Sequence, residues 1–255
     1  MDSQLLMIER MDPSISKIVL NRPEKHNALS LELMDELCCA LADLESSGCH
    51  VVILSAEGKD FCSGLDLQQA SDEELIGKIG LQLAKLFTLL HNTSLVTIAT
   101  VQGHAVAGGG GLAASCDIML MAEGARIGFP ETRRGLVAAQ VSAILVRQLS
   151  IRHVRELLLL GEFVDCRRAL EIGLANDVVR LDELQNEALR MAQKVLKGSP
   201  GAIKETKRLL EKLTPGNFSK DFELALSVHH AVRISSEARE GIASFLEKRP
   251  PEWEK

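Results

Sequence analysis

The sequence predicts an α/β fold built on mostly parallel strands. Three observations support this prediction: short apolar segments alternate with helical ones, the connections between them are long enough to cross over a sheet, and the chain from Gly135 onward is almost wholly helical. With 255 residues, 46% of them apolar and 25% charged, the chain has the size and composition of one compact domain with a small appended helical piece.

A hairpin and a capped helix are predicted at the start of the chain. Two β-rich runs, residues 5–9 and 15–20, are separated by Asp12-Pro13-Ser14, whose residue types favour a turn. Ser30 is the predicted cap of a helix that continues to Glu45, because the leucines of this segment recur at helical spacing.

Strand candidates then alternate with helices. A capping box at Ser71 and Glu74 predicts a helix toward His91, and a short helix is predicted over residues 109–115. The strand candidates are residues 51–54, 96–101, 118–121 and the brief run 177–179.

The last third of the chain is predicted to be a helical region. Ser199-Pro200 is a helix start with proline at the first helical position, and Thr214-Pro215-Gly216 interrupts the helix that follows. We therefore expect a core of residues 1–195 and a C-terminal helical region of residues 196–255.

Charge and composition restrict the possible partners. A net charge of −6 provides no broad basic field for nucleic acid, so a small ligand is expected. The most apolar region, residues 95–122, is interrupted by glycines, His104 and Asp117, which excludes a membrane span. The six cysteines form no C-x-x-C pair and the seven histidines form no metal-ligand motif, which predicts reduced thiols in the cytoplasm and no metal site. The first ten residues lack the features of a targeting peptide.

Three segments carry the chemistry. Residues 61–67 place Gly64 in a loop after a strand, where a backbone N–H can face a ligand, although an ordinary loop fits this segment as well. Residues 106–112 contain four glycines before a short helix, which allows either a ligand or another helix to approach closely; a nucleotide loop lacks its usual lysine and glycine spacing. Residues 129–136 contain Glu131 beside a proline, either as a proton-transfer group or as a helix first-turn acid.

Taken together and in order, these segments resemble the crotonase (enoyl-CoA hydratase/isomerase) superfamily, over nearly the whole chain. The motifs that carry the resemblance are residues 21–29 (Asn-Arg-Pro-Glu-Lys-His-Asn-Ala-Leu), 63–66, the glycine run with Leu112 and Cys116-Asp117, Pro130-Glu131, and 245–250.

The resemblance implies a spiral of β-β-α units with a C-terminal helical trimerisation region, assembled as a homotrimer or hexamer, and an acyl-CoA substrate. Coenzyme A is then part of the substrate, and no separate cofactor is implied. The family's oxyanion hole corresponds to the backbone N–H groups of Leu65 and Gly108, and its catalytic acid-base group to Glu131. The substrate-binding residues that the resemblance implies are Lys25, Asp66, Leu67, Gln68, Gly109 and, from a neighbouring subunit, Lys248.

The sequence departs from the well-known hydratases at one position. Their first catalytic glutamate corresponds to Gly111, which leaves Glu131 to handle both water and proton transfer. We expect an enoyl-CoA hydratase-like lyase; a Δ3-Δ2-enoyl-CoA isomerase and a catalytically silent acyl-CoA-binding protein stay open. No second acid follows Glu131, so a dienoyl-CoA isomerase is unsupported. Gln140 and His104 are expected to be structural hydrogen-bonding residues, and His229-His230 to lie on a surface or interface helix.

Overall fold

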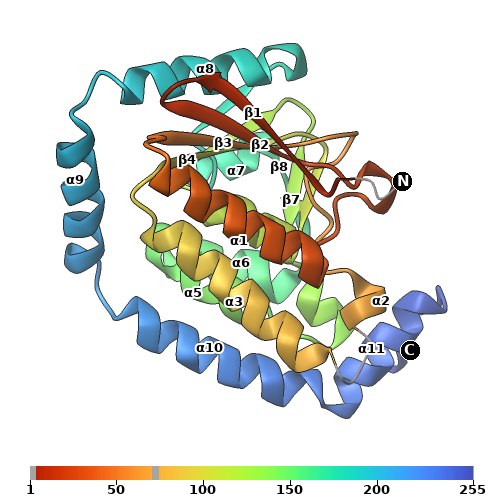
Figure 1. The fold of residues 1–255 in the computed structure, drawn as a ribbon. Helices are drawn as coiled ribbons and strands as arrows, with labels where there is room; N and C mark the ends of the chain where they lie inside the picture. The colour runs from red at the N-terminus through yellow and green to blue at the C-terminus, as the bar shows by residue number, and fades with distance from the viewer. Residues whose placement is uncertain (1–3, 71–74, 255) are drawn as a thin grey trace.

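The main sheet has six strands, in the order β1-β2-β3-β4-β6-β9 (Figure 1). The computed structural model describes residues 4–70 and 75–254. Only β1 and β2 pair antiparallel, and every other neighbouring pair in this sheet is parallel, which confirms the predicted α/β class. The strands are β1 (Leu6–Asp12), β2 (Ile15–Leu20), β3 (Val51–Ala56), β4 (Val96–Val101), β6 (Ile118–Ala122) and β9 (Asp177–Val179).

The central strands are covered on both faces. Every residue of β3 and β4 is buried, as continuous apolar runs in a parallel sheet should be. Helix α8 (Leu184–Val195) packs on β3, β4 and β6, and Figure 1 shows it on the opposite side of the sheet from α1 (Leu31–Ser46) and α3 (Ile76–Asn92).

A second sheet of three short strands extends beside the first. It consists of β5 (His104–Val106), β7 (Arg126–Gly128) and β8 (Phe163–Asp165) in that order. The sequence analysis missed all three strands, and β8 interrupts the part of the chain that it predicted to be helical except at residues 177–179. A three-residue strand is too short to produce a recognisable alternation of side chains.

The predicted helix starts are mostly confirmed. The Ser30 side chain accepts a hydrogen bond from the Leu33 N–H at the start of α1, and Pro200 occupies the first turn of α9 (Pro200–Leu213). The predicted capping box at Ser71 and Glu74 lies outside the described residues. The remaining helices are α2 (Leu67–Ala70), α4 (Gly108–Ala114), α5 (Ala139–Gln148), α6 (Ile151–Leu160), α7 (Cys166–Glu171), α10 (Phe218–Arg233) and α11 (Ser236–Leu246).

The C-terminal helices pack back onto the core of the same chain. Helix α10 contacts α5 and α3, and α11 contacts the short 3₁₀ helix η2 (Pro130–Arg134). Figure 1 shows α9 at the edge of the molecule, with α10 and α11 along the side opposite α8. Residues 196–255 therefore form part of the surroundings of η2. Within the described residues, no helix has the length and apolarity needed to cross a bilayer.

Candidate active site

A cavity of about 90 Å³ lies where the predicted chemical segments meet. Its walls come from the loop before α2, the start of α4, the segment from η2 into α5, and α10. Most of the wall is apolar, which is usual for a small-molecule site with a few orienting polar groups. The lining residues that matter below are Leu65, Leu67, Gly108, Glu131, Arg134 and His229.

The Leu65 N–H faces away from its neighbouring segment. Leu65 forms an isolated parallel bridge with Leu29, in which the Leu29 N–H donates to the Gly64 carbonyl and the Asp66 N–H donates to the Leu29 carbonyl. In such a bridge the N–H of the bridged residue itself points to the other side. The Leu65 N–H donates no hydrogen bond to any described residue, and Leu65 lines the cavity.

The second N–H, that of Gly108, is oriented by an unusual backbone. Gly108 is the first residue of α4, so its N–H has no partner within the helix. The preceding Ala107 has a positive φ of 51°, a conformation that side chains disfavour and that its N–H bond to Gly128 O helps to hold. The loop of Gly64 packs closely against the segment before Gly108, because a Cβ at Gly64 would meet Val106 O at 2.9 Å.

Glu131 is a carboxyl group in the cavity wall. Its Oε2 atom is buried and has no hydrogen-bond partner among the described residues. Burial raises the pKa of Glu131 to about 7, an effect opposed by the bond to its own backbone and by the nearby Arg134 guanidinium. A carboxyl group with such a pKa can both accept and donate a proton near neutral pH.

At Gly111, the position that corresponds to the family's first catalytic glutamate, neighbouring side chains leave no space for a side chain. A Cβ added at Gly111 would meet Val141 Cγ2 at 2.7 Å and Phe87 Cζ at 2.8 Å. Gly111 and Phe87 are buried in the core. This chain therefore has neither the carboxylate nor the space for one at that position.

Two of the other predicted substrate-binding residues are engaged elsewhere. Asp66 is buried and pairs with Arg22 at 3.1 Å, while Gly109 lies so close to the Cys62 carbonyl that any Cβ would collide with it. The glycine run thus serves close packing at Gly109 and leaves Gly108 with an N–H that has no partner within the helix. Leu67 lines the cavity, and Gln68, which is exposed, is not among the described lining residues.

The two lysines lie outside the cavity. Lys25 is exposed on the 3₁₀ helix η1 (Pro23–Lys25), and its carbonyl accepts a bond of 3.5 Å from the hydroxyl of Ser63, a lining residue. Lys248 is exposed just beyond α11, with a positive φ of 55°. The structure brings neither lysine into the described wall of the cavity.

The sequence analysis missed the contribution of α10. His229, which was expected on a surface or interface helix, lies partly buried on α10 and also lines the cavity, together with Val232 and Arg233. No local motif marks them, because only the packing of α10 against α3 and α5 brings them there. Gln140 donates to Gly80 O at 2.8 Å and His104 bonds the Asp60 carboxylate at 2.7 Å, so each makes a structural hydrogen bond as expected. Gln140 also lines the cavity, and His104 is not among its described lining residues.

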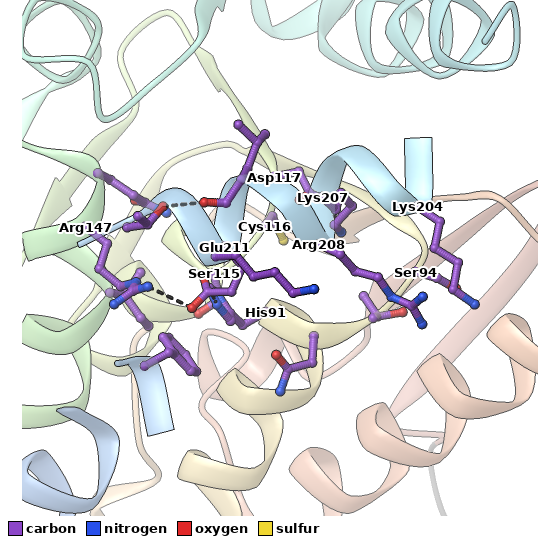
Figure 2. Close-up of a pocket in the computed structure, with 18 of the residues that line it drawn as sticks. His91, Ser94, Ser115, Cys116, Asp117, Arg147, Lys204, Lys207, Arg208 and Glu211 are labelled. Atoms are coloured by element: carbon purple, nitrogen blue, oxygen red, sulfur yellow. Dashed lines mark hydrogen bonds and ion pairs between the residues drawn. The ribbon is translucent and has the colours of Figure 1, made fainter. Parts of the chain in front are cut away.

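A second cavity, of about 740 Å³, separates α9 from the core (Figure 2). Three ion pairs cross the gap: Lys207 of α9 binds Asp117 at 2.7 Å, and Glu211 of α9 binds both Arg147 and His91 at 2.7 Å. These ion pairs attach α9 to the core. No group of three or more metal-ligand side chains occurs among the described residues, here or in the smaller cavity.

Leu65 and Gly108, whose N–H groups have no backbone acceptor among the described residues, line the same cavity as the buried carboxyl oxygen of Glu131. Backbone donors and a carboxyl group in one cavity suit a carbonyl compound whose oxygen gains negative charge during reaction. Comparison with known proteins identifies the family of the chain. A model of the Enoyl-CoA hydratase/isomerase family matches residues 10–255, and the chain belongs to that family.

Similar proteins extend over the full chain. A Thermus thermophilus protein named "Putative enoyl-CoA hydratase" is 37% identical over 253 residues, covering 97% of this chain and 100% of that protein. Human enoyl-CoA hydratase domain-containing protein 3, mitochondrial, is 32% identical over 243 residues, covering 94% of this chain and 80% of that protein. The crystal structure of an enoyl-CoA hydratase from Mycobacterium avium superposes with a TM-score of 0.88 at 32% identity, covering 99% of this chain and 100% of that one. The crotonase fold predicted from the motifs is thereby confirmed.

Proposed function

We propose that the protein is an enoyl-CoA hydratase, a lyase that adds water across the double bond of a 2-enoyl-CoA thioester. The observation that carries this proposal is the buried, unpartnered Oε2 of Glu131 in the same cavity as Leu65 and Gly108. The relatives named as hydratases support the same reaction.

In the proposed reaction the thioester oxygen accepts hydrogen bonds from the Leu65 and Gly108 N–H groups. Glu131 takes a proton from water, the water oxygen bonds to C3, and the electron pair of the double bond moves into an enolate. Glu131 then returns its proton to C2. Each fixed donor is worth about 2.7–4 kcal/mol to such a charged oxygen, and the pKa of Glu131, raised by burial to about 7, suits both proton transfers.

The coenzyme A end of the substrate is proposed to lie toward the loop of Ser63. Lys25 is then a contact for the phosphates, and Lys248 is one from a neighbouring subunit of a homotrimer or hexamer. In this proposal Asp66, Gly109 and Gln68 shape the loops around the substrate, while Leu67 contacts it. All six cysteines are unpaired, which suits the reducing cytoplasm that we propose as the compartment.

The packing at Gly111 favours a second candidate, a Δ3-Δ2-enoyl-CoA isomerase. With Phe87 and Val141 in the place of the first glutamate, Glu131 is the one carboxyl group among the described residues that line the cavity. Isomerisation needs one such group: Glu131 would take a proton from C2 of the 3-enoyl-CoA and return it to C4, without water.

The test is to follow the absorbance of crotonyl-CoA and of a longer 2-enoyl-CoA with purified protein. Hydration removes the conjugated enoyl chromophore, whereas isomerisation of a 3-enoyl-CoA creates it. We expect hydration, with a kcat for Glu131→Gln roughly 100- to 10,000-fold lower, the usual contribution of a positioned acid-base group.

Glu162→Gln is the matched control, because Glu162 is an exposed acid paired with Arg133 outside the cavity. Its kcat should stay within twofold of the wild type. Turnover of 3-enoyl-CoA alone would replace the hydratase with the isomerase. Binding of both thioesters without any turnover would identify a silent acyl-CoA-binding protein.

A further inference from the structure

Arg134 places a guanidinium group in the cavity, beyond the group that we assign to proton transfer. Glu131 and Arg134 are three residues apart on η2, and side chains at this spacing in a 3₁₀ helix lie on the same side. With a rise of about 2.0 Å per residue, Arg134 lies about 6 Å further along the helix axis than Glu131. Both line the cavity, so a chain that passes Glu131 can continue to Arg134.

The Arg134 guanidinium lies over an aromatic ring. Its carbon lies 4.0 Å from the centre of the Phe245 ring, on α11, in a cation–π contact. The Arg134 backbone is fixed as well, because Gly241 of α11 approaches the Arg134 carbonyl so closely that no Cβ fits between them. A guanidinium that lies over an aromatic ring contacts the ring with one face, and its N–H groups remain able to donate hydrogen bonds at its edges.

The positive charge of Arg134 has no anionic partner among the described residues. Although Glu131 is near enough to influence it, no hydrogen bond or ion pair joins Arg134 to that carboxylate or to another described residue. Apolar side chains such as Leu136 and Val137 form the neighbouring wall, and burial lowers the pKa of Arg134. A charge in such surroundings is costly unless a ligand neutralises it.

Arg133 shows the contrast. It precedes Arg134 directly, yet its side chain is half exposed and is paired with Glu162 at 3.0 Å and with the Leu160 carbonyl at 3.0 Å. Arg133 thus has its polar partners within the protein and is not among the described residues of the cavity wall. The other, Arg134, lies in the cavity wall, which the buried Arg233 also lines.

We propose that Arg134 binds a carboxylate at the far end of the acyl chain, so that the preferred substrates are coenzyme A thioesters of short dicarboxylic acids. The planar fork of an arginine matches a carboxylate in a bidentate arrangement. This inference rests on the proposed function, since it requires the thioester to lie at Leu65 and Gly108. It specifies the acyl group, which the hydratase assignment leaves undefined.

Calorimetric binding of two unreactive thioesters tests the inference. Glutaryl-CoA and pentanoyl-CoA have the same number of acyl carbons and differ in the terminal carboxylate. For the wild type we expect glutaryl-CoA to bind roughly 10- to 100-fold more tightly, the range for a charged hydrogen-bonded pair. In Arg134→Gln the two should bind within threefold of each other, with pentanoyl-CoA unchanged.

Arg133→Gln is the matched control and should keep the preference for glutaryl-CoA. Arg134→Lys retains the charge but not the fork, and should keep only part of the preference, so the inference stays testable if the glutamine variant fails to fold. Equal binding of both thioesters by the wild type would overturn the inference while leaving the acyl-CoA site intact. A preference that survives in Arg134→Gln would also overturn it. Failure of both thioesters to bind would reject the inference together with the proposed function.

Discussion

Glu131 combines a buried oxygen with a pKa near neutrality, and both come from its position on η2. The side chain is enclosed by apolar residues of the η2–α5 segment and by α10, so the charged form loses its hydration. The same desolvation that suits proton transfer must weaken the folded state whenever Glu131 is ionised.

Removing the Glu131 charge should therefore stabilise the protein in alkaline solution. With a folded-state pKa of about 7 against 4.5, the folded state keeps a proton between these pH values that the unfolded state has released, so stability falls as pH rises through this window. Glu131→Gln should gain up to about 3 kcal/mol over the wild type at pH 8 and little at pH 4. Thermal unfolding of both proteins across this range measures the difference. A gain independent of pH would contradict the raised pKa.

Gly111 shows how one residue changes the chemistry that is open to the fold. Because Phe87 and Val141 occupy the space beside it, a glutamate cannot be reinstated there without repacking the core. The packing as well as the sequence therefore leaves no carboxylate at this position.

At the scale of elements, α11 holds the segment that carries Glu131 and Arg134. Gly135 meets the backbone of Glu237, and Gly241 meets that of Arg134, each without room for a side chain. These two contacts let α11 lie directly against η2. The position of both polar groups in the cavity therefore depends on a helix more than a hundred residues away in the sequence.

Gly241→Ala should displace η2 and reduce activity. Overpacking of this kind costs about 1–3 kcal/mol of stability, and a shift of about 1 Å in a catalytic group can lower the rate roughly 100-fold. Gly201→Ala is the control, since Gly201 on α9 has open space around it and alanine is the better helix former. Thermal unfolding and kcat of both variants provide the comparison. An unchanged kcat in Gly241→Ala would show that α11 does not position the site.

At the scale of the whole molecule, exposed apolar side chains include several on α6 and α9. Leu159 on α6 is 70% exposed and Leu213 on α9 is 68% exposed, with Leu160, Leu209 and Leu210 nearby in sequence and also exposed. Large contiguous patches of exposed apolar surface mark protein–protein interfaces.

We expect the protein to be a homotrimer or hexamer in solution, with a mass three or six times the 27.8 kDa of one chain. Size-exclusion chromatography with light scattering measures this mass. Leu213→Asp should shift the assembly toward smaller species, whereas Leu181→Asp, at a leucine exposed on a separate 3₁₀ turn, should not. A monomeric wild type would contradict the expectation.

Much of the fold could be predicted from the sequence because it is encoded locally. The alternating apolar strands, the Ser30 cap and the Thr214-Pro215-Gly216 break are visible at short range, and the structure has each of them. The order of the motif segments identified the family, and the Glu131, Leu65 and Gly108 positions were inferred from it; all three residues line one cavity.

Only the tertiary structure decided what surrounds those residues. The strands β5, β7 and β8 are too short to produce a periodic signal, and the positive φ of Ala107 follows from no sequence rule. His229 and Arg233 reach the cavity because α10 packs back on the core, and Arg134 separates from Arg133 because one side chain faces the cavity and the other faces Glu162. Spacing along the chain determines which face of an element is apolar, but the contacts of a polar side chain depend on segments distant in sequence, which meet only when the core is packed.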